Sequence, residues 1–179
     1  MDNWHSLGTA GEHIEVVEYR ADWPLVFERE AAAILAACRP WITEGHHIGS
    51  TSVPGLAAKP ILDVLPVAAG PAKADEAVSR MAALGYRYRG ENGIVGRFYF
   101  DRVVDGRTVM HVHMFPAGHP EVHRHLVFRD HLRANPDAAR EYERLKRELA
   151  ARYRDDRRAY TDAKAAFITS VIDAAMRDA

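Results

Sequence analysis

The segment 46–66, HHIGSTSVPGLAAKPILDVLP, contains the residue types best suited to chemistry in this chain. A short strand is expected to end at Ile48, and a hydroxyl-rich glycine turn follows it, formed by Gly49, Ser50, Thr51 and Ser52. Backbone N–H groups and hydroxyls in such a turn can cradle a phosphate or another anion, and a purely structural tight turn is the alternative. We expect no serine nucleophile, because the neighbouring sequence lacks the ordered histidine and acid that would activate one.

Two charged residues follow the turn. Lys59 lies between the turn and the next apolar run, where its ammonium group can meet a phosphate or the end of a helix. Asp63 is the only charged residue of that run, 60–65, which has the length of a strand. A carboxylate among apolar residues needs a partner, so Asp63 is predicted to be a site residue, with a structural cap or an ion pair as the alternative.

A predicted hairpin supplies two histidines. The runs 97–104 and 107–115 flank Asp105-Gly106, a pair typical of a two-residue type I′ turn. The expected register places His111 opposite Phe100 and His113 opposite Phe98, so both histidines share one face of the hairpin. They are candidates for metal ligands or for acid–base groups, and ordinary residues of a half-exposed strand are the alternative.

Other polar residues near the hairpin are weaker candidates. Arg97, at its start, is predicted either to bind an anionic ligand or to pair with Asp101. A second histidine group comprises His119, His123 and His125, and its spacing can chelate a metal. Because Glu121 is the only acid close to this group, we expect these three histidines to be exposed to solvent.

Composition limits the classes of function. The chain has 179 residues, about one domain, with 24 basic and 25 acidic side chains, so no overall charge attracts it to nucleic acid or to an anionic membrane. The arginine-rich stretch 144–158 is interrupted by acids and is predicted to be a solvated helix face. A single cysteine, Cys38, and the lack of an apolar run near the ~20 residues that span a bilayer favour a cytoplasmic protein. The oligomeric state is left open.

The pattern of elements predicts one α+β domain over 14–179 after a flexible polar tail, 1–13. Strands are expected at 14–19, 47–48, 60–65 and 86–89 and in the hairpin, and helices at 22–39 and 71–84. Three further helices are expected to begin at Pro120, at Asn135-Pro136 and at Thr161-Asp162, which makes the C-terminal third helical.

Several segments together resemble the GrpB family. They are HIGSTSVPGLAAKPILDV, GIVGRFYF, HVHMF, FRDHLRANPDAAREYERLKRELAARY and AYTDAKAAFI, and the likeness covers roughly 14–172. GrpB proteins are similar to the nucleotidyltransferase fold, and a related domain occurs fused to dephospho-coenzyme A kinases. The resemblance implies a mixed sheet flanked by helices and a nucleotide-like or otherwise phosphorylated small-molecule ligand.

The nucleotidyltransferase pattern implied by this resemblance is matched only in part. Ile48-Gly49-Ser50 matches the turn that approaches the triphosphate, and Asp63 matches the first of two carboxylates at positions i and i+2. Leu65 occupies the second position. One carboxylate holds Mg²⁺ weakly unless phosphates and water complete its shell, so transfer chemistry with two metal ions is not expected.

The histidines offer another metal set. His47, His111 and His113 could surround Asp63, and three imidazoles with one carboxylate suit Zn²⁺, Fe²⁺, Mn²⁺ or Ni²⁺ better than Mg²⁺. Alternatively, a histidine acts directly as general acid or base and Asp63 orients it. Three functions follow. The first is a nucleotidyltransferase-like pocket that binds a nucleotide or another phosphorylated small molecule, with transferase activity dependent on a divalent metal (Mg, Mn or Zn) as an option. The others are a binding or regulatory module without catalysis and a metal-dependent hydrolase.

Overall fold

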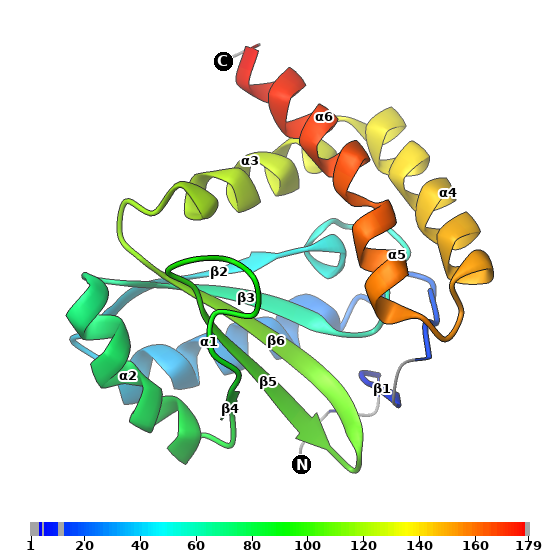
Figure 1. Ribbon diagram of the computed structural model, residues 1–179. Helices are drawn as coiled ribbons and strands as arrows, with labels where there is room; N and C mark the ends of the chain where they lie inside the picture. Colours follow the sequence, from blue (N-terminus) through cyan, green and yellow to red (C-terminus); the bar gives the residue numbers. More distant parts are fainter. Residues whose placement is uncertain (1–3, 5, 11–12, 178–179) are drawn as a thin grey trace.

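The computed structural model describes residues 4, 6–10 and 13–177, and it places a mixed sheet between two groups of helices (Figure 1). The strands are β1 (Thr9–Ala10), β2 (Ile42–Ile48), β3 (Leu62–Ala68), β4 (Arg87–Tyr88), β5 (Phe98–Val104) and β6 (Arg107–Pro116). Their order is β2-β3-β6-β5-β4, and β1 pairs with the start of β6. The central strands β3 and β6 run parallel, whereas their outer neighbours are antiparallel to them.

The helices divide between the two faces of the sheet. One face is covered by α1 (Trp23–Cys38) and α2 (Pro71–Ala83). Figure 1 shows the C-terminal helices on the opposite side: α3 (Pro120–Ala134), α4 (Pro136–Arg152), α5 (Arg157–Ala163) and α6 (Ala165–Arg177). Prolines in the first turns of α1 to α4 suit those positions, where the missing N–H has no intrahelical partner in any case. The predicted α+β class with a helical C-terminal third is confirmed.

The pleat of the sheet separates two cores. Val64, Val112 and Met114 face α1 and α2 and belong to the main hydrophobic core. On the other face, Leu65 and Phe115 pack with residues of α3 in a second cluster. Successive residues of β3 and β6 therefore alternate between the main core and the side covered by the C-terminal helices.

The N-terminal predictions are partly wrong. Among the described residues of the predicted tail, Trp4 and Leu7 are buried in the main core, as expected for large apolar side chains. In the same segment, β1 pairs with β6 and so joins the sheet. The strand predicted over 14–19 is reduced to a bridge between Val17 and Ala58.

The hairpin is confirmed but its register differs from the expected one. Asp105 and Gly106 both have positive φ, as a type I′ turn requires. Between the pairs Val103–Thr108 and Arg102–Met110 the register shifts by one residue, which is a β-bulge. As a result, His111 pairs with Asp101 and His113 with Tyr99, rather than with the two predicted phenylalanines.

The predicted final helix is two helices. Asp156 caps α5 by accepting a hydrogen bond from the N–H of Ala159, so helix begins before the predicted Thr161-Asp162 start. The chain then breaks at Lys164 and continues as α6. None of the helices in the described part of the chain combines the length and apolar character needed to cross a bilayer.

Candidate functional site

A cavity of about 1060 Å³ opens between the sheet and the C-terminal helices. The sheet contributes residues of β2, β3, β5 and β6, and the opposite wall comes from α3, α4, α5 and α6. Asp63, His111 and His113 lie on the wall formed by the sheet. The cavity therefore contains the three residues predicted from sequence to be catalytic.

Strand pairing brings these three residues together. Asp63 on β3 is the direct neighbour of His111 on β6, and His113 follows two residues later on the same face. Asp63 Oδ1 lies 3.3 Å from His111 Nδ1 and 3.2 Å from His113 Nε2. The predicted proximity of Asp63 to both hairpin histidines is confirmed.

The surroundings shift the pKa values of Asp63 and His111. Burial disfavours the Asp63 carboxylate, but the hydrogen bonds and charges of the two imidazoles outweigh burial and hold its pKa well below the usual range. Burial also lowers the pKa of His111, although the Asp63 carboxylate opposes that shift. The group is thus a carboxylate held by two partly buried imidazoles.

Two arginines contact the outer nitrogens of the imidazoles. Arg97 Nη1 lies 3.3 Å from His113 Nδ1, and Arg157 Nη2 lies 3.5 Å from His111 Nε2. A guanidinium group can only donate, so each outer nitrogen accepts and each imidazole turns its own N–H toward Asp63. Tyr99 packs against both rings, with centroid distances of 5.6 and 5.3 Å.

Gly49 is held against Asp63. Its φ is +70°, and a Cβ added there would lie 2.5 Å from Asp63 Oδ2. Only glycine allows the backbone to pass so close to the carboxylate. Arg133 of α3 fixes the far side of the turn by donating to the carbonyl of Ser52 at 2.9 and 2.7 Å.

The three hydroxyls of the turn have different surroundings. Ser50 is half-buried, lines the cavity and lies beside the Tyr142 hydroxyl. Thr51 also borders the cavity, but its hydroxyl is 3.0 Å from His47 Nε2. Ser52 is buried and donates to the carbonyl of Gly49 at 2.6 Å, and it does not line the cavity. Of the three predicted hydroxyl ligands, Ser50 is therefore the one placed to meet a ligand.

The prediction that His47 joins Asp63 is wrong. His47 pairs with Val64, whereas Asp63 pairs with Ile48, so the pleat directs His47 to the opposite face. There it stacks on Phe27 of α1 at a centroid distance of 4.6 Å. Burial lowers the pKa of His47 to about 4, which is expected for a neutral structural imidazole.

Lysines from the C-terminal region were not predicted as site residues. Lys146 and Lys164 line the cavity together with the predicted Lys59. Burial and neighbouring positive charge lower the pKa of Lys146 and that of Lys164 to about 7. Arg157, within the stretch predicted to be a solvated helix face, also lines the cavity.

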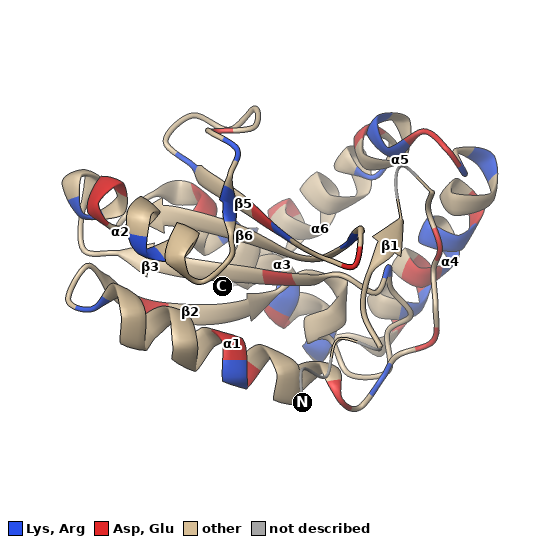
Figure 2. Cartoon of the chain, turned by 90° about the horizontal axis from the view of Figure 1, so that it is seen from below, with Lys and Arg blue, Asp and Glu red and all other residues tan. Residues whose placement is uncertain are grey.

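Positive charge predominates around the cavity. Among the described residues, eight lysine and arginine side chains line it against four carboxylates. Three of those carboxylates already pair with neighbouring arginines, namely Asp101, Glu121 and Asp162. Figure 2 shows basic segments on α4 and α5 and beside β5. The arrangement is suited to an anionic ligand.

The second histidine group is not uniformly exposed. His123 is exposed as predicted, but His119 stacks on Phe115 and accepts from the N–H of Glu121 at the start of α3. His125 lines the cavity 5.4 Å from the His113 ring, and burial lowers its pKa to about 3. The available sequence signal for His125 was its position next to Leu126 and three residues after Val122, two apolar residues of α3 that pack against the sheet.

Leu65 occupies the position where a second carboxylate was sought. It is fully buried and packs with Ile48, Val67 and Phe115 under α3. A carboxylate there would be surrounded by apolar groups, so the local packing is built around a hydrocarbon side chain.

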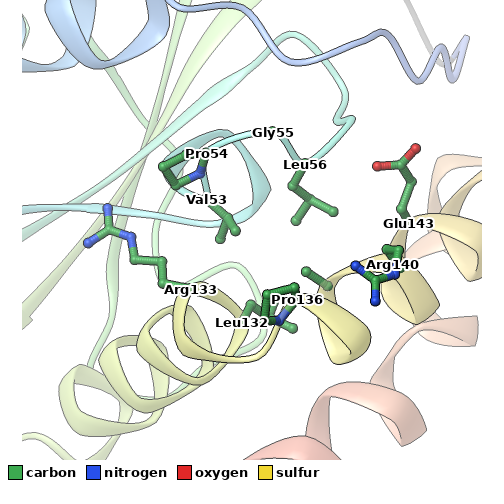
Figure 3. Close-up of a pocket in the computed structure, with 10 residues that line it drawn as sticks. Val53, Pro54, Gly55, Leu56, Leu132, Arg133, Pro136, Arg140 and Glu143 are labelled. Atoms are coloured by element: carbon green, nitrogen blue, oxygen red, sulfur yellow. The ribbon is translucent and has the colours of Figure 1, made fainter.

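A second hollow lies elsewhere on the surface. About 490 Å³ in volume, it lies between the turn after β2 and the junction of α3 with α4, and Figure 3 shows Leu56, Leu132 and Pro136 facing it. Arg133, Arg140 and Glu143 are its charged residues. It contains no group comparable to Asp63 with its two histidines, so the larger cavity is the candidate site.

The chain has a nucleotidyltransferase-like fold. The structure of Cid1 in complex with its short product ApU superimposes with a TM-score of 0.51 and 12% identity, covering 76% of this chain and 43% of that one. At this identity the likeness shows the fold alone.

The family follows from closer matches. Residues 13–174 match the family described as GrpB protein, and the chain belongs to this family. The crystal structure of conserved protein GrpB from Enterococcus faecalis has a TM-score of 0.84 and 39% identity, covering 92% of this chain and 98% of that one. UPF0157 protein YqkA from Bacillus subtilis (strain 168) is 41% identical over 164 residues, which are 92% of this chain but 48% of YqkA, so the chain spans about half of that relative.

Proposed function

We propose that the cavity binds a nucleotide or another phosphorylated small molecule together with one divalent cation held by Asp63, His111 and His113. One observation carries the proposal: one ligand atom from each of these residues lies within 4.8 Å of the others, in a cavity with predominantly basic walls. The Asp63 group supplies the donors for a cation, and the basic side chains favour an anion.

The separations of the Asp63 oxygen from the two imidazole nitrogens fit a single ion. Ligand atoms bound to one ion at ~2.0–2.2 Å are separated by roughly 3.4 Å in a tetrahedral site. The Asp63 oxygen lies 3.3 and 3.2 Å from the two imidazole nitrogens. Two nitrogens and one oxygen suit Zn²⁺ or Mn²⁺ better than Mg²⁺, and they leave positions for water or phosphate oxygens. When bound, such an ion acts as a Lewis acid that polarises a phosphoryl oxygen.

The anion would be received by Gly49, Ser50, Arg97 and Arg157. Both arginines now donate to the outer imidazole nitrogens, which keeps the imidazole protons on the side of Asp63. If the inner nitrogens serve as metal ligands, those protons move to the outer nitrogens and the arginines lose their acceptors. A phosphate group offers replacement acceptors for both guanidinium groups, so cation and anion binding favour each other.

The fully buried Leu65 favours a second candidate function, a binding module without phosphoryl transfer. Nucleotidyl transfer by the two-metal route requires carboxylates that hold both ions, and an apolar cluster stands where the second carboxylate would be. In this function the ligand binds as proposed but is released unchanged. The two candidates differ in turnover and share the same binding site.

Calorimetric titration tests the proposal. ATP, GTP and coenzyme A are each titrated into the protein with Mn²⁺, Zn²⁺, Mg²⁺ or no metal, followed by chromatography of the ligand to detect turnover. We expect saturable binding that Mn²⁺ or Zn²⁺ strengthens and that Asp63→Asn and His113→Ala both weaken. His123→Ala, which changes an exposed histidine of α3 outside the cavity, is the matched control. Absence of binding, or equal binding by the Asp63→Asn variant, would overturn the proposal.

A further inference from the structure

We propose that Lys59, Lys146 and Lys164 form a second anion subsite in the same cavity, so that the ligand is a nucleoside di- or triphosphate rather than a monophosphate. This inference rests on the proposed function and deepens it by naming the class of ligand. We refer to these three residues as the lysine subsite. It is built by the segment before β3, by α4 and by the junction of α5 with α6.

Aromatic rings hold the lysine subsite together. Lys59 and Lys164 both lie over the ring of Tyr160, with their Nζ atoms 5.2 and 4.3 Å from its centroid. Lys146 lies over Tyr142 at 4.9 Å and also donates to the carbonyl of Ala57. The ammonium groups thus converge on two neighbouring tyrosines that line the cavity.

The acid nearest to Lys146 along α4 is bound to other groups. Glu143 lies one turn from Lys146, but it accepts from the N–H of Ala57 at 3.0 Å and pairs with Arg147 at 3.0 Å. Within the part of the chain that the structure describes, neither Lys146 nor Lys164 forms a salt bridge.

Grouping like charges costs free energy where, as here, Lys146 is buried and Lys164 half-buried, and contacts with aromatic rings offset that cost only in part. The depressed pKa values of Lys146 and Lys164 reflect this cost. A bound polyanion would offset it by supplying negative charge to Lys146 and Lys164. Lys146 has a structural use in its bond to Ala57, but the described contacts of Lys164 include no such bond, so Lys164 is the sharper test.

The lysine subsite and the Asp63 group are separate parts of one cavity. The turn residue Ser50 lies beside the hydroxyl of Tyr142, and Lys146 lies over the ring of that tyrosine. One phosphate at the Asp63 group, near Arg97 and Arg157, would not supply an anion to Lys146 and Lys164. A chain of two or three phosphates can satisfy both, which is why the cavity selects for polyphosphorylated ligands.

The test compares AMP, ADP and ATP by calorimetry in the presence of Mn²⁺, with tripolyphosphate as a competitor. We expect ATP to bind at least ~10-fold more tightly than AMP, and tripolyphosphate to displace ATP. Lys164→Gln should reduce ATP affinity by about the same factor and leave AMP affinity unchanged, whereas Lys164→Arg should retain the preference. Lys73→Gln is the matched control, because Lys73 is an exposed residue of α2 paired with Glu76.

Equal affinities of the wild-type protein for AMP and ATP would overturn the lysine subsite and leave the proposed function standing. The same conclusion follows if Lys164→Gln leaves the preference for ATP intact. If none of the three nucleotides nor tripolyphosphate binds, and GTP and coenzyme A do not bind either, the proposed function itself is overturned. Thermal melting checks that each variant is folded. If Lys164→Gln does not fold, the ATP and AMP affinities of Lys59→Gln are compared instead.

Discussion

The contact between Gly49 and Asp63 predicts a large effect of Gly49→Ala. The backbone at Gly49 has φ +70° and ψ −175°, a region populated almost only by glycine, where another residue costs roughly 1–3 kcal/mol. The added methyl group would also lie 2.5 Å from Asp63 Oδ2 and 3.1 Å from its Cβ and Cγ. The shifts of side chain and backbone that would make room for this methyl group typically cost another ~1–3 kcal/mol. Together we expect a loss of roughly 2–6 kcal/mol of unfolding free energy.

Gly55→Ala is the matched control for this change. Gly55 has φ +79°, but a Cβ there would meet nothing within 4 Å, so only backbone strain of roughly 1–2 kcal/mol is expected. Urea denaturation of both variants gives the two free energies of unfolding. Gly49→Ala should also weaken metal binding, because Asp63 must shift. A Gly49→Ala protein as stable as Gly55→Ala would show that the close approach to Asp63 is not the constraint inferred here.

Three further predictions follow. Leu65→Ala should lower the free energy of unfolding measured in urea by roughly 2–5 kcal/mol. Leu65→Asp should lower it further, because the variant buries an unpaired carboxylate. A stable Leu65→Asp protein would contradict the packing seen under α3. Thr51→Val should lower the free energy of unfolding by about 1 kcal/mol, because the hydrogen bond with His47 is lost, and should leave ATP affinity unchanged in calorimetry. Unchanged stability with weaker ATP binding would show instead that the Thr51 hydroxyl binds the ligand. Between about pH 7 and pH 9 calorimetry should show ATP affinity falling and protons being taken up on binding, because Lys146 and Lys164, with pKa values lowered to about 7, lose their charge in the free protein over this range. Affinity that rises with pH would contradict a role for these lysines.

Local sequence patterns predicted much of the sheet and part of the site. The Asp105-Gly106 turn and the apolar runs around it fixed the hairpin, and alternation placed His111 and His113 on one face. The expected partners of the histidines were wrong because a bulge shifts the register by one residue, and no local pattern marked that bulge. Such a shift exchanges the two faces of a strand relative to its neighbour.

The remaining site residues depend on packing that the sequence does not reveal. His47 immediately precedes Ile48, the neighbour of Asp63, yet the pleat turns it to the other face. Lys146 lies on α4 and Lys164 at the junction of α5 with α6, and the placement of these elements over the sheet depends on tertiary contacts, so neither lysine was identifiable from local sequence. Asp63 was identifiable because a charged residue within an apolar strand requires a partner wherever the strand lies.

The most direct measurement is anomalous diffraction from crystals grown with Mn²⁺ and a non-hydrolysable ATP analogue. We predict one anomalous peak bound by Asp63, His111 and His113 at ~2.0–2.3 Å, with a phosphate oxygen completing the coordination shell and the analogue lying in the cavity lined by Arg97 and Arg157. A fully occupied analogue with no metal peak at these three residues would contradict the cation site. An analogue bound elsewhere, such as the hollow between α3 and α4, would contradict the assignment of the cavity.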